Sequence, residues 1–183
     1  MAADELAAAL LPALLHKLNN VTQVIASVNS LARLTGCAAP LVQCASDLDL
    51  AGGELARLGW LVGALARGVG SGIGSPRHEE RALEWLLDLL GETLRRDGWE
   101  LAPGSEIPRV EPEFGFESSW AIASWILACA HSGAQREPLA FALERAGTAL
   151  VLRTSRAPQQ AEGLRTRLEA LVPRSHLRYE VRT

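Results

Sequence analysis

The sequence predicts an α+β protein in which an N-terminal antiparallel helical hairpin forms a dimeric four-helix bundle and a C-terminal segment forms an α/β sandwich. Two long heptad patterns open the chain, one Gly/Ser-rich stretch interrupts it, and short alternating segments mix with helical ones afterwards. The 183 residues are 48% hydrophobic and only 5% aromatic, a globular composition that favours helix.

The first heptad pattern predicts a helix from about Asp4 to Leu34. Its seam is Ala7, Leu11, Leu14, Leu18, Val21, Ile25, Val28 and Ala32. Gly36 supplies a C-terminal stop, and Pro40 falls in the first turn of a second helix, from about Ala39 to Ala66. The second seam is Leu41, Cys44, Leu48, Ala51, Leu55, Leu58, Val62 and Leu65. Gly52-Gly53 inside this helix predicts a bend or a close helix contact.

Two helices joined by a short turn form a hairpin that leaves one side of each seam poorly covered. Two such hairpins close a core together as a four-helix bundle, so we expect a homodimer. In the alternative, the second half of the chain covers the seam and the protein is a monomer. Trp60 lies on the second helix outside its seam, which suits a contact with the second half.

The stretch from Gly68 to Pro76 is rich in Gly and Ser and predicts a linker between residues 1–70 and residues 77–183. The order of elements expected after it is a helix Glu79–Arg96, a short strand Trp99–Leu101, a buried helix Ser118–Ser132 capped by Ser118 or Ser119, two strands Leu139–Glu144 and Thr148–Thr154 turning at Ala146-Gly147, a helix Gln159–Leu171 and a strand His176–Val181. This order predicts a sandwich with helices on one face of a mixed sheet.

Composition excludes several classes of partner and site. A net charge of -3 gives no polyanion-binding surface, so nucleic acid is not expected. No apolar stretch is long enough to span a bilayer, and the N-terminal residues lack the basic start of a secretory signal, so we expect no membrane association and a cytoplasmic protein. Cys37, Cys44 and Cys129 form no CxxC pair, which gives little support to a disulfide or a zinc site.

His16 is the candidate catalytic residue. It points almost directly away from the core side of the first helix, which carries Leu14, Leu18, Val21 and Ile25. The side that it occupies is polar and also carries Asn20, Gln23 and Ser27. An exposed imidazole is mostly neutral at cytosolic pH, and its ring nitrogen can attack a phosphoryl group in line. On geometry alone, a solvated surface histidine without a role is the simpler interpretation.

The segment from His16 to Asn20, early in the first helix of a heptad hairpin, resembles the H box of sensor histidine kinases. That motif reads His, acid, Leu, Asn or Arg, Asn or Thr, and often Pro, so four positions match, while Lys17 replaces the acid and Val21 the Pro. The dimerisation and phosphoacceptor domain of that family is a homodimeric four-helix bundle. The acid is the family's usual base in autophosphorylation, so Lys17 argues against kinase activity and less against phosphotransfer.

The second half is similar in layout to the ATP-binding domain of the same family. The segment from Ser124 to Ser132 looks like the helix that carries the magnesium-binding Asn, and Cys129 stands at that position. A thiol is a poor ligand for Mg²⁺. Where the family has Asp-x-Gly against adenine, this chain reads Ser155-Arg156-Ala157, and the Gly-rich lid over the phosphates is missing. The resemblance therefore implies a degenerate histidine-kinase ATPase-like domain that does not bind ATP well.

Taken together, the resemblance implies a dimeric histidine phosphotransferase of a two-component phosphorelay. His16 would relay phosphoryl groups between aspartates of response-regulator receiver domains, on a docking surface lined by Lys17, Asn19, Asn20 and Gln23. The receiver would supply Mg²⁺, so no cofactor or metal is expected in this chain. The main alternative is a non-catalytic pseudo-histidine-kinase scaffold that dimerises and binds signalling partners. An active ATP-dependent kinase is a second alternative.

Overall fold

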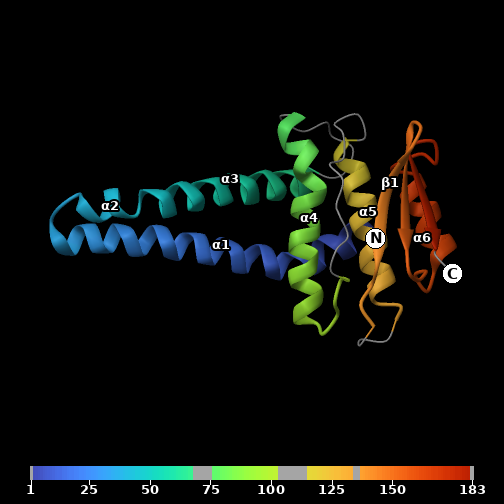
Figure 1. Ribbon diagram of the computed structural model, residues 1–183, viewed down its shortest axis with the longest axis horizontal. Coiled ribbons are helices and arrows are strands. Elements are labelled where there is room, and N and C mark those ends of the chain that lie inside the picture. The colour runs from blue at the N-terminus through green and yellow to red at the C-terminus, as the bar shows by residue number, and fades with distance from the viewer. Residues whose placement is uncertain (1, 68–75, 103–114, 134–136, 182–183) are drawn as a thin grey trace.

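The protein is α+β, with an elongated helical part and a compact part that carries a small sheet (Figure 1). The computed structural model describes residues 2–67, 76–102, 115–133 and 137–181. The elements in chain order are α1 (Ala2–Thr35), α2 (Ala39–Gln43), α3 (Ala45–Arg67), α4 (Pro76–Arg96), α5 (Gly115–Ala130), β1 (Phe141–Ala146), β2 (Ala149–Thr154), α6 (Ala161–Glu169) and β3 (Leu177–Val181). In this described part, no helix is both long enough and apolar enough to cross a bilayer.

The N-terminal hairpin is formed by α1 and α3, which lie antiparallel to each other (Figure 1). The first helix is confirmed, but the second predicted helix is two helices, because Cys44 ends α2 with non-helical dihedral angles (φ -102°, ψ 19°). Pro40 lies in the first turn of α2 and is buried, whereas the chain runs through Gly52-Gly53 as regular helix. The expected bend therefore lies about two turns earlier than predicted.

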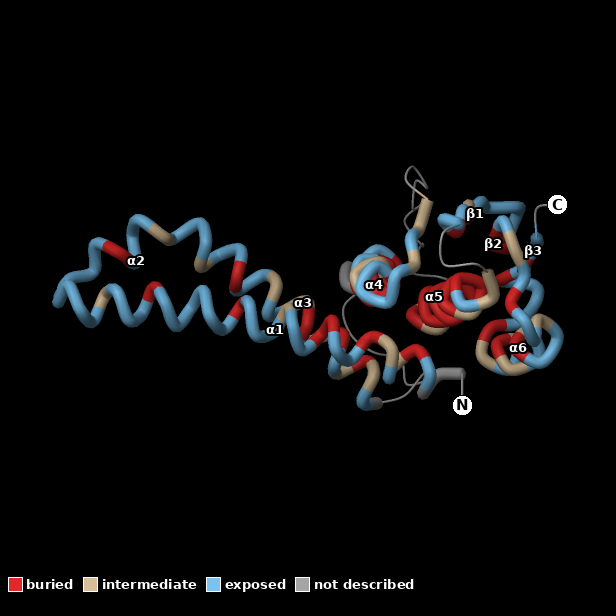
Figure 2. The backbone as a smooth tube through the Cα atoms, turned by 90° about the horizontal axis from the view of Figure 1, so that it is seen from below, coloured by how far each residue is buried: buried red, intermediate tan, exposed pale blue. Residues whose placement is uncertain are grey.

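Each predicted seam separates into two columns with opposite exposure. On α1, the column facing α3 is buried and contains Leu14, Val21 and Val28, while the other column is exposed and contains Leu11, Leu18 and Ile25. On α3, the buried column contains Ala51 and Leu58, and the exposed one contains Leu55 and Val62. Figure 2 shows that most of the hairpin beyond α4 is exposed. A single chain thus covers half of each seam.

The core of the compact part is built around α5. Trp120 and Trp125 are essentially fully buried in it, and Figure 2 shows α5 enclosed between α4 and the sheet. A helix that is apolar on all sides needs cover on all sides, which explains its central place. The predicted cap was wrong: α5 begins at Gly115, and Ser118 and Ser119 are buried inside it. The predicted linker falls mostly on residues 68–75, outside the described residues.

The sheet is mixed, with strand order β1-β2-β3. Strands β1 and β2 pair antiparallel around a turn in which Gly147 has a φ of +65°, and β2 and β3 pair parallel on either side of α6. The hairpin and the last strand are confirmed, but the expected strand at Trp99–Leu101 is only an isolated bridge between Leu101 and Leu139. Helices α5 and α6 lie on the same face of the sheet (Figure 2).

Candidate functional site

His16 lies on the exposed surface of α1, as expected from its position on the polar side. Nδ2 of Asn20, one turn later, donates a hydrogen bond to Nε2 of His16 over 3.3 Å. In the tautomer that accepts this bond, the ring proton is on Nδ1 and Nε2 holds the lone pair. The arrangement therefore presents a ring nitrogen with a polar neighbour on a rigid helix.

Lys17 does not share this surface. Its side chain is only 22% exposed, and its Nζ lies 3.2 Å from Asp88 and 3.5 Å from Glu92, both on α4. Oδ2 of Asp88 also accepts a hydrogen bond of 2.8 Å from Arg57 on α3. Lys17 is thus part of a charged cluster that joins α1, α3 and α4, and its ammonium is paired there with two carboxylates.

The cluster keeps Asp88 ionised. Burial works against its charge, but the hydrogen bond from Arg57 and the charge of Lys17 outweigh burial, so the pKa of the Asp88 carboxyl is lowered. Because this side chain is about half exposed, its ion pairs are partly screened by solvent. The main effect of the cluster is to hold α4 in place across the hairpin.

The other predicted docking residues are exposed on α1. Asn19 and Gln23 face solvent, and Asn20 borders a shallow groove of about 370 Å³ between α1 and α3. The floor of this groove is apolar, and the residues lining it are Asn20, Val21, Val24, Asp47, Leu50, Ala51 and Glu54. The α3 residues of the groove were not predicted, because which residues of two helices meet across a hairpin depends on their register.

At the position expected for a magnesium ligand, the thiol of Cys129 is fully buried, and its Sγ donates to Oγ1 of Thr154 on β2 over 3.7 Å. Burial raises the pKa of this thiol to about 11, so it stays protonated at neutral pH. Nearby, the guanidinium of Arg156 donates to the carbonyl oxygen of Glu137 over 2.6 Å. These residues do not fit the donor set that a Mg²⁺-nucleotide requires.

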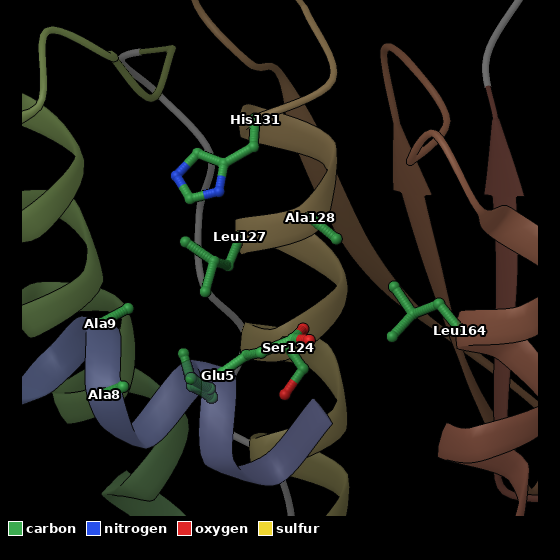
Figure 3. A pocket seen from close by; sticks show the side chains of 9 residues that line it. Glu5, Ala8, Ala9, Ser124, Leu127, Ala128, His131 and Leu164 are labelled. Atoms are coloured by element: carbon green, nitrogen blue, oxygen red, sulfur yellow. The ribbon is translucent and has the colours of Figure 1, made fainter. Parts of the chain in front are cut away.

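A second cavity, of about 360 Å³, lies where the N-terminal turns of α1 meet α5 and α6 (Figure 3). Glu5 from α1, Ser124 and His131 from α5 and Leu164 from α6 line it. Sequence reasoning missed this cavity, because its lining comes from three helices that are far apart in the chain. Among the described residues, no group of three or more His, Cys, Asp or Glu side chains could hold a metal ion.

Comparisons with protein-family models, with curated proteins and with solved structures find no match to this chain.

Proposed function

We propose that this protein is a histidine phosphotransfer protein in which His16 accepts a phosphoryl group from an aspartyl phosphate on a response-regulator receiver domain and passes it to another. The observation that carries the proposal is the exposed imidazole of His16, with its Nε2 3.3 Å from Asn20 Nδ2 on a rigid helix. A neutral ring nitrogen on a fixed mount is what in-line phosphoryl transfer requires of an acceptor.

The chemistry needs little from the rest of this chain. As Nε2 bonds to phosphorus, the bond from phosphorus to the aspartate oxygen breaks, and its electron pair leaves with the carboxylate. The Asn20 amide, released from Nε2, can then donate to a phosphoryl oxygen. Mg²⁺ is supplied by the receiver domain, so the proposal asks for no metal ligand or cofactor here.

The proposal includes a homodimer. On each helix, the exposed column is rotated about the helix axis in the same sense from the buried column that contacts the other helix. Because α1 and α3 are antiparallel, the two exposed columns therefore lie on the same side of the hairpin. That side combines Leu11, Leu18, Ile25, Leu55 and Val62. A contiguous apolar strip with heptad spacing suits the same strip of a second copy, which would complete both seams in a four-helix bundle. His16 is on the opposite side of α1 and stays accessible.

The scaffold alternative is favoured by one observation, the engagement of Lys17 with Asp88 and Glu92. The residue after His16 is thus a lysine whose ammonium is paired with α4, and it cannot act as the base that an acid supplies at this position in the resembling family. The same observation weighs more heavily against an ATP-dependent kinase, which also needs the nucleotide-binding residues that Cys129 and Arg156 replace. Transfer from an aspartyl phosphate, already an activated donor, depends less on such a base.

One labelling experiment separates the three functions. The protein is incubated with radiolabelled phosphorylated receiver domains and, separately, with labelled ATP and Mg²⁺. We expect acid-labile label from receiver domains only, lost in His16→Ala and kept in the matched control His131→Ala, which removes another exposed histidine. Label from ATP would indicate a kinase. No label from either donor, with receiver domains still bound, would indicate a scaffold and would contradict the proposal.

A further inference from the structure

Helix α4 crosses the hairpin from α3 to α1. Its first half lies over α3, where the ring of Trp85 is 5.6 Å from that of Trp60 in an edge-to-face arrangement. One turn later, Asp88 accepts the hydrogen bond from Arg57, also on α3. The predicted contact of Trp60 with the second half of the chain is thereby confirmed.

The second half of α4 lies over α1. Glu92 is 3.5 Å from Lys17, and Oγ1 of Thr93 donates to the carbonyl oxygen of Ala9 over 3.3 Å. Beyond Thr93 the last turn continues past α1, on the flank away from α3, and Figure 1 shows the lower end of α4 extending beyond α1. This last turn carries Arg95 and Arg96.

His16 lies on that same flank. It follows Ala9 by about two helical turns on nearly the same side of α1, which is a distance of about 10 Å along the axis. It is also the residue next to Lys17, towards which Asp88 and Glu92 point from α4. The face of α4 that carries these two acids is therefore directed towards the part of α1 that contains His16.

Arg96 continues this face of α4, one turn after Glu92, and its side chain is 51% exposed. Arg95 is exposed as well. Basic residues in a last turn interact favourably with the helix dipole, but the dipole does not select the flank that faces His16. The ion pair of Arg96 with Asp97, at 3.4 Å between two exposed side chains, is weak and easily exchanged.

We infer that the last turn of α4 belongs to the docking surface of His16, and that Arg95 and Arg96 bind carboxylates on the receiver domain. The inference rests on the proposed function. A protein that holds Mg²⁺ beside its reacting aspartate must present carboxylates at that surface. Guanidinium groups are well suited to carboxylates because their planar donors bind them bidentately. The docking surface thus spans α1 and α4, and the cluster of Lys17, Asp88 and Arg57 holds its two parts together.

The test is a charge reversal, Arg95→Glu with Arg96→Glu, against a matched control, Arg33→Glu with Arg178→Glu. The control changes the net charge equally on two exposed arginines, one in the last turn of α1 and one on β3. Arg33 is about 25 Å along α1 from His16. The dissociation constant for purified unphosphorylated receiver domains is measured for each variant at low and high salt, so the readout does not depend on phosphotransfer.

We expect the reversal on α4 to weaken binding about tenfold or more at low salt and to flatten its salt dependence, while the control changes binding less than about twofold. Equal affinities for the α4 variant and the wild type, or equal losses in the two variants, would overturn the inference while leaving phosphotransfer to His16 intact. If no receiver domain binds the wild-type protein, the proposed function fails and this inference fails with it.

Discussion

Nζ of Lys17 lies 3.2 Å from Oδ2 of Asp88, so the residue next to His16 ties α1 to α4. Arg57 binds the same carboxylate at 2.8 Å, and one acid therefore joins three helices. Lys17 therefore has a structural role in joining α1 to α4.

Replacing Asp88 by Asn should lower the free energy of unfolding by about 1 kcal/mol, because it leaves two partly buried cations without their shared anion. The urea midpoint measures this loss. The matched control is Glu162→Gln, which neutralises an acid that is 80% exposed and forms an ion pair with Arg165 on its own helix, and it should change stability little. Equal losses in both variants would show that the cluster holds nothing together.

The same carboxyl should make stability depend on acid pH. Its pKa is lower in the folded than in the unfolded protein, so its contribution is present above the unfolded value of about 3.9 and disappears as the pH falls through the folded value. The difference in unfolding free energy between wild type and Asp88→Asn should therefore be larger at pH 6 than at pH 3. Urea titrations of both proteins at the two pH values measure it, and a difference independent of pH would contradict this role.

Breaking the exposed apolar strip should separate the proposed dimer. Leu18→Glu with Leu55→Glu places charges where the two copies would meet, and light scattering after gel filtration should then give the 19.6 kDa mass of one chain instead of twice that mass. Leu34→Glu is the control, because this leucine is 85% exposed at the end of α1 and outside the strip. A wild-type protein that is already a single chain would rule out the four-helix bundle.

The three thiols should react with an aromatic disulfide reagent in a fixed order. Cys37 is exposed, and its hydrogen bond to Thr35 lowers its pKa, so it should react first. Cys129 should react only after unfolding, because it is buried and its pKa is raised to about 11. Absorbance traces with and without urea give the order, and Cys37→Ser should remove the fastest phase. A fast reaction at Cys129 in the native protein would contradict its burial.

Local patterns predicted the elements better than their ends. The helix periods and the turn at Gly147 were readable because each depends on residues close together in the chain. The interruption at Cys44 and the start of α5 at Gly115 were not, because no Gly or Pro marks the interruption and because α5 begins before the expected serine caps. Tertiary burial on all sides of α5 outweighed the capping preference of Ser118 and Ser119.

The site divides in the same way. The exposure of His16 and its polar side followed from the sequence alone, because the 3.6-residue period places it away from the apolar seam. The direction of Lys17, the groove beside Asn20 and the position of the last turn of α4 beyond α1 were decided only by the tertiary structure. They depend on where α4 crosses the hairpin, and that crossing is set by the packing of Trp85 and the burial of α5, between segments too far apart in the chain for any local pattern to record.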